Sequence, residues 1–170
     1  MNSFPVDDGV FEAPLFLKPL NLRLNVSFIQ EDDAARPTAR QLAALGHFQS
    51  LPTTLRHAIQ PHALNFCDRI DDVVCLAEEG IDLDRANIAK HYRLTDLVIP
   101  PLADTLANFF FLAADCDWEP EHGMQIVLDG QEIIYCNEHT TLAFGAAWKR
   151  ILSTPNTDRR AALRAEIARL

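Results

Sequence analysis

Residues 108–136, with the sequence NFFFLAADCDWEPEHGMQIVLDGQEIIYC, decide the fold of this chain. The stretch contains an apolar run, an acidic turn, and two short apolar-rich segments on either side of Asp129-Gly130. Asp-Gly between two such segments is typical of a type I′ β-hairpin, because both central residues of that turn need a positive φ. The stretch therefore predicts three consecutive antiparallel strands.

A turn at Asp129-Gly130 also predicts the register of the hairpin. It pairs Leu128 with Gln131 and places Met124 opposite Tyr135. Side chains alternate along a strand, so one face should carry most of the apolar residues. That predicted core face consists of Met124, Ile126, Leu128, Ile133 and Tyr135. The opposite face is mixed, and we expect it to be only partly covered.

The run at residues 108–114 shows no alternation, with Phe109, Phe110, Phe111 and Leu112 in succession. A strand that is covered on both faces has this pattern, and so does a buried helix. The hairpin that follows favours a central strand.

The N-terminal part predicts two strands and a helical region. Residues 10–17 and 21–29 read as a strand pair joined at Lys18-Pro19. A helix should begin at Thr38, because Thr38 and Gln41 form a capping box in which each side chain satisfies a free backbone N–H. Its apolar residues at helical spacing are Leu42, Leu45 and Phe48.

A second, longer helix should begin near Pro52. It carries an apolar stripe over about five turns, formed by Leu55, Ile59, Ala63, Phe66, Ile70 and Val73. Pro61 lies inside this helix and removes one backbone hydrogen bond, so the pattern predicts a kink. We expect this helix to pack on the sheet.

The remaining segments are shorter. A short helix is predicted from Asp82 to about His91, an extended piece at 94–101, and a helix at 142–152. A final helix at 158–170 has only Leu163, Ile167 and Leu170 as a thin apolar stripe. This helix could dock on its own domain or contact a partner. Together the elements predict an α+β fold with an antiparallel sheet of about five strands packed against one long kinked helix. Residues 1–153 form the domain, and 154–170 form a linker and terminal helix.

Charge and composition restrict the classes of partner. The chain has 24 acidic and 15 basic residues, a net charge of −9. Nucleic acids and anionic membranes require a basic surface, so neither is an expected partner. No apolar run is long enough to span a bilayer and no signal peptide is visible, so we expect a cytoplasmic protein.

The four cysteines lack the spacing of a zinc site. They lie at positions 67, 75, 116 and 136, and without a secretion signal they should be reduced thiols. Cys116 and Cys136 could lie on nearby strands, which leaves a disulfide between them as an alternative.

The only candidate site is the acidic joint, which we define as residues 115–122. Its candidate binding residues are Asp115, Asp117, Trp118, Glu119, Glu121 and His122. As a calcium loop the joint has Pro120 where glycine is needed, and it lacks the histidine spacing of a zinc protease. Three interpretations remain open: a solvated acidic edge, an edge that binds a partner, and a metal or catalytic site. We expect no metal and no cofactor.

The segment CDWEPEHGMQIVLDGQEIIY resembles a motif of small bacterial proteins of unknown function, an acidic-W-x-x-E-H-G turn before a β-hairpin. Fainter similarity extends to Asp8-Gly9-Val10-Phe11 and to Pro37-Thr38-x-x-Gln41. The resemblance implies an α+β domain without an assigned activity. Some similar proteins occur beside toxin genes, where an immunity role is suspected. The chain departs from them at Pro100-Pro101 and in its terminal helix.

These observations predict a non-enzymatic protein that acts by surface binding, with a toxin or another protein as partner and self-association as an alternative. The rival hypothesis is a small metal-dependent or carboxylate-based hydrolase that uses the acidic joint. An enzyme would need groups from other segments, such as His62, His91 or His139, to meet Glu119 and Glu121 in a pocket.

Overall fold

A single mixed sheet forms the centre of the computed structural model, which describes residues 6–7, 10–29, 36–78, 80–81, 86–100, 108–139, 153–155 and 157–169. Seven strands lie side by side in chain order, and the first has only two residues. The strands are β1 (Val6–Asp7), β2 (Val10–Leu17), β3 (Leu22–Ile29), β4 (Tyr92–Ile99), β5 (Phe109–Cys116), β6 (Met124–Asp129) and β7 (Glu132–Glu138).

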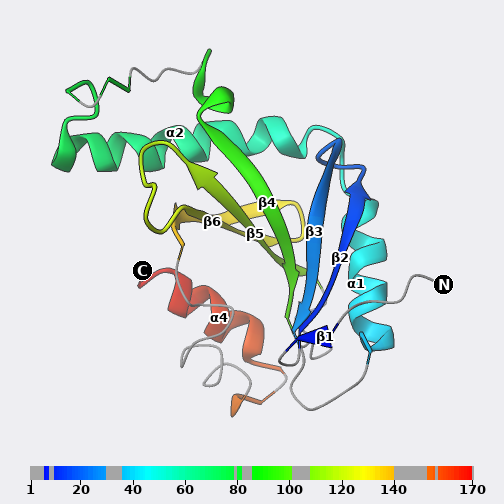
Figure 1. The fold of residues 1–170 in the computed structure, drawn as a ribbon. Coiled ribbons are helices and arrows are strands. Elements are labelled where there is room, and N and C mark those ends of the chain that lie inside the picture. The colour runs from blue at the N-terminus through cyan, green and yellow to red at the C-terminus, as the bar shows by residue number, and fades with distance from the viewer. Residues whose placement is uncertain are drawn as a thin grey trace.

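One parallel pair interrupts an otherwise antiparallel sheet. β3 and β4 run parallel, with Asn25 opposite Asp96 and Phe28 opposite Ile99. Parallel neighbours need a crossover connection, and helices α1 (Ala39–Gln49) and α2 (Leu55–Val74) lie in that connection. Figure 1 shows both helices beside the sheet.

The predicted fold class was therefore wrong. It assumed an antiparallel sheet of about five strands against one long kinked helix, but six substantial strands and a parallel pair are present. Residues 94–101, predicted to be a short extended piece, mostly belong to the full central strand β4. Two helices share one face of the sheet, and a third, α4 (Arg159–Ile167), packs on the other.

The α1 helix begins with the predicted capping box. Thr38 and Gln41 exchange side-chain and backbone hydrogen bonds as expected. The inward residues differ from the prediction, because Gln41 is buried while Leu42 is 49% exposed. The Gln41 amide donates to the carbonyl of Ile29 at 2.7 Å and contacts that of Ile99 at 3.4 Å. It thus ties α1 to the ends of the parallel strands.

The α2 helix buries the predicted stripe, from Leu55 through Ile59 and Ala63 to Phe66. These side chains join the large core between the helices and the sheet. The helix is continuous from Leu55 to Val74 with Pro61 inside it. Pro61, where the sequence predicts a kink, therefore does not end or divide the helix.

The second core lies between the sheet and α4. Leu163 and Ile167, two residues of the thin apolar stripe for which docking and partner contact were the alternatives, are buried against the sheet. The sheet contributes Val98, Phe109, Phe111, Val127 and Tyr135. Alternate residues of the Phe109–Leu112 run enter the two cores, which confirms the central strand covered on both faces.

The three strands after residue 108 are antiparallel as predicted, but the register of the hairpin differs. Asp129 pairs with Glu132, so the turn is Gly130-Gln131, with a φ of +64° at Gly130. Glycine with positive φ at the first central position is the pattern of a type II′ turn. A bulge between Val127 and Leu128 then shifts Tyr135 to the α4 face.

Both faces of β6 are covered, contrary to the prediction for its mixed face. Gln125, Val127 and Asp129 are all buried. Some predictions lie outside the described residues: the start of the short helix at Asp82, and the helix at 142–152. Within 86–91, a short 3-10 helix, η1 (Ile88–Lys90), leads into β4.

Candidate functional site

The acidic joint connects the end of β5 to the start of β6. Gly123 closes it, because its φ is +72° and a Cβ there would lie 2.6 Å from the carbonyl oxygen of Ala114. The Gly123 amide donates to the Glu119 carbonyl at 2.9 Å. Glycine is needed at this position both for the backbone angle and for the close approach of the two chain segments.

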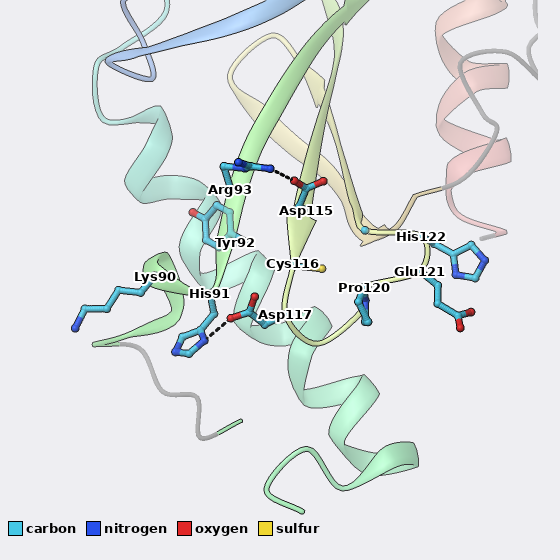
Figure 2. Close-up of a pocket in the computed structure, with 11 residues that line it drawn as sticks. Lys90, His91, Tyr92, Arg93, Asp115, Cys116, Asp117, Pro120, Glu121 and His122 are labelled. Atoms are coloured by element: carbon cyan, nitrogen blue, oxygen red, sulfur yellow. Dashed lines mark hydrogen bonds and ion pairs between the residues drawn. The ribbon is translucent and has the colours of Figure 1, made fainter. Parts of the chain in front are cut away.

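A pocket of about 550 Å³ lies beside the joint (Figure 2). One side consists of Lys90, His91, Tyr92 and Arg93, at the entry to β4. The other consists of Asp115–Asp117 and Pro120–Gly123. Antiparallel pairing of β4 with β5, which sets Tyr92 opposite Cys116, brings the two sides together.

Two carboxylates of the joint are paired across this pocket (Figure 2). Arg93 forms an ion pair with Asp115, and Nδ1 of His91 lies 2.8 Å from Oδ2 of Asp117. These acidic side chains are largely exposed to solvent. Exposed pairs contribute little to stability, so the main effect of Arg93 is to reduce the negative charge of the joint.

Trp118 is the one predicted binding residue that the structure removes from the surface. It is 3% exposed and packs edge to face against Phe66 and Tyr92. Its Nε1 and the Tyr92 hydroxyl are buried and have no hydrogen-bond partner among the described residues. Trp118 therefore anchors the joint to the core and is not available as an aromatic contact for a partner.

A second cluster lies at the far end of the joint. Glu119, His122 and Glu138 each place a potential ligand atom within 4.8 Å of the others. Oε1 of Glu119 is 3.1 Å from Nδ1 of His122. Glu138 is the last residue of β7. The backbone amide of His139, the next residue, donates to the Gly123 carbonyl at 3.0 Å.

The pocket contains no activated thiol. Cys116 lines it, but burial raises the pKa of this thiol to about 12. The thiolate is the nucleophilic form of cysteine, so Cys116 is inert near neutral pH. All four cysteines are free, as the absence of a pairing pattern predicts.

The structure therefore divides the predicted site into three parts. Asp115 and Asp117 pair with Arg93 and His91 across the pocket, Glu119 and His122 join Glu138, and Glu121 is exposed at the rim. Sequence reasoning missed Lys90, Arg93 and Glu138. The alternation in β4 could have placed Arg93 near the joint, whereas Glu138 depends on the hairpin register.

The fold and this site define an α+β domain with a mixed sheet and a charged loop surface at one end of it. The chain belongs to the family described as a domain of unknown function, DUF6985, whose model matches residues 5–143. No curated protein and no solved structure matched the chain. The family match agrees with the resemblance to proteins of unknown function, and it ends before α4.

None of the helices in the described part of the chain combines the length and the apolar content that a membrane span requires.

Proposed function

We propose that this chain is a non-enzymatic cytoplasmic bacterial protein that acts by binding a positively charged protein partner through the acidic joint. The observation that carries the proposal is the excess of carboxylates around the pocket. Asp115, Asp117 and Glu121 line the pocket and outnumber Lys90 and Arg93, the lysine and arginine that line it. A surface of one sign steers an oppositely charged partner and contributes to specificity.

Two exposed carboxylates are the best candidates for contact with the partner. Asp117 has a side chain that is 59% exposed, and Glu121 is exposed at the pocket rim. A second copy of the chain suits this surface poorly, because a symmetric contact would place like charges opposite each other. The partner is therefore a different, basic protein.

An immunity role is the specific form of this function that the resemblance suggests. In that case the partner is a toxin encoded next to this chain. The test is co-expression with the product of the neighbouring reading frame. Protection of the host by the parent chain, lost on reversing the charge of Asp117 and Glu121, is the expected result. Protection that persists in the charge-reversed protein overturns the role of the joint.

The rival function is a small hydrolase that uses the joint. One observation favours it: Glu138, from a different strand, does meet Glu119 and His122. Of the other predicted contributors, His91 contacts Asp117 instead of Glu119 or Glu121. Hydrolysis of a model ester or phosphodiester, abolished by His122→Asn and Glu138→Gln, would establish the rival.

A further inference from the structure

We propose that Glu119, His122 and Glu138 form a binding site for a first-row divalent cation of the zinc type. This site goes beyond partner binding, because its ligands differ from Asp117 and Glu121, on which partner binding depends. It combines one imidazole nitrogen with two carboxylates. Nitrogen and carboxylate oxygen are ordinary ligands of zinc in proteins.

The spacing of the groups fits a common ion. Zinc binds such ligands at about 2.0–2.2 Å, so two ligands of one ion lie about 3.3–3.6 Å apart at tetrahedral angles. The Glu119–His122 separation of 3.1 Å is close to this spacing, and a small shift of the exposed His122 side chain reaches it. The third group lies within 4.8 Å of both, and a rotation of the exposed Glu138 side chain closes the remaining distance.

The backbone around the site holds the three groups together before any ion binds. Glu119 is 18% exposed, and its Oε1 also accepts the backbone N–H of His122 at 3.3 Å. The Gly123 amide bonds to Glu119, and the His139 amide bonds to Gly123. These bonds connect the joint to the end of β7, so the ligands come from a fixed frame.

Charge also favours a cation at this point. Two carboxylates close to each other destabilise one another when both are ionised. A divalent ion cancels both charges, and the neutral imidazole completes the set without adding charge. Calcium needs six to eight oxygen ligands, which the three side chains do not supply, so a transition-metal ion fits better.

The pair His91–Asp117 provides a natural control. It has the same two ligand types at 2.8 Å, yet among the described residues only Glu119, His122 and Glu138 form a three-membered group. Binding of a cation that merely attaches to surface histidines should depend on both pairs. Binding at a preformed three-residue site should depend on Glu119–His122 and not on His91–Asp117.

The experiment titrates the full chain with ZnCl₂, following the melting temperature and the heat of binding. Zinc should raise the melting temperature in a concentration-dependent way, because a ligand that binds only the native state stabilises it. His122→Asn and Glu138→Gln should each weaken zinc binding at least about tenfold, while His91→Asn leaves it unchanged. Both ligand side chains to be replaced are exposed, so the metal-free variants should melt as the parent does.

Three results overturn the site. The first is no zinc effect on the parent. The second is binding that survives in Glu138→Gln but is lost in His122→Asn, which indicates attachment to a lone histidine. The third is equal loss in His91→Asn, which indicates adventitious binding. Co²⁺ substitution supplies an independent check, since its visible absorption should show low-coordinate nitrogen and oxygen ligands in the parent and not in Glu138→Gln.

Discussion

Arg164 of α4 donates from Nε to Oδ2 of Asp129 at 2.8 Å, and the Asp129 side chain is only 1% exposed. Arg160, one turn earlier, donates from Nε to the same Oδ2 at 3.0 Å, and its Nη2 lies 2.7 Å from Oδ1. Asp129 lies within the matched family residues and α4 lies beyond them. A helix outside the family match thus supplies the counter-charge for a buried carboxylate inside it.

The first prediction concerns this buried charge. A buried carboxylate without a partner is strongly unfavourable, whereas the two arginines are partly exposed and can be solvated when alone. The double variant Arg160→Gln/Arg164→Gln should therefore lower the free energy of unfolding more than Asp129→Asn, which should lose about 1–3 kcal/mol. Urea denaturation measures both. The reverse order would show that the arginines contribute mainly by packing.

A second prediction concerns the whole terminal helix. Deletion of residues 156–170 removes Leu163 and Ile167 from the second core and uncovers Phe109, Phe111 and Val127. Exposed apolar surface of this kind promotes association. The truncated chain should melt at a lower temperature and elute as a larger species in gel filtration. A monomer with the parent melting temperature would mean that α4 is not docked in solution.

A third prediction separates two effects of glycine. Gly130 and Gly123 both have positive φ, but a Cβ at Gly130 meets nothing within 4 Å while one at Gly123 meets the Ala114 carbonyl oxygen at 2.6 Å. Gly130→Ala should cost only backbone strain, about 1–2 kcal/mol. Gly123→Ala should cost about 2–4 kcal/mol, because the two chain segments must also move apart. Equal losses in denaturant titrations would contradict the close approach.

The fourth prediction is loss of stability in alkali. Burial raises the pKa of Cys136 from 9.0 to about 12 and that of Tyr92 from 10.0 to about 12. The folded protein keeps these protons at a pH where the unfolded chain releases them, so stability falls as the pH rises. Stability should be constant with respect to these groups below pH 9 and decrease between about 9 and 12. Denaturant titrations across that range test the direction.

A fifth prediction concerns the burial of the cysteines, which thiol labelling measures. Cys75 is exposed, whereas Cys67, Cys116 and Cys136 are buried. At neutral pH one thiol per chain should react rapidly with an aromatic disulfide, and three should react only on unfolding. Substitution of Cys75 by Ser should remove the rapid phase. Rapid reaction of more than one thiol would contradict the packing of the large core, to which all three buried cysteines belong.

Local patterns predicted the local elements well. The capping box of Thr38 and Gln41 and the strand run from Phe109 to Leu112 depend on residues near each other in the chain, and both are confirmed. Errors arose where distant segments decide the outcome. The parallel contact of β3 with β4 follows from how α1 and α2 cross the sheet, which no local pattern encodes.

In the candidate site, too, neighbouring residues allowed correct predictions and distant residues caused the errors. The acidic joint was visible as a run of alternating carboxylates, but Trp118 was expected at the surface and instead lies between Phe66 and Tyr92. The burial of Asp129 was also missed, because its partners Arg160 and Arg164 follow it by more than 30 residues. The bulge that follows Val127 sets the register at Glu138, and a two-residue turn pattern cannot reveal a bulge.

The most direct test of the central claim is affinity capture from the native host with matched variants of the full chain. The parent is compared with Asp117→Lys/Glu121→Lys, which reverses two exposed charges of the joint. The control is Asp68→Lys/Asp72→Lys, which makes the same change on exposed carboxylates of α2 that do not line the pocket. A fourth form, Ala161→Glu/Ala165→Glu, alters the exposed face of α4.

All four forms should melt cooperatively, which verifies that the substitutions leave the fold intact. The account predicts one basic protein that the parent, the α2 control and the α4 variant all retain and that the joint variant loses. Direct titration of that protein should show weaker binding by the joint variant and, for the parent, weakening with increasing salt. A partner that the joint variant retains and the α4 variant loses would contradict the account and place the binding surface on the terminal helix.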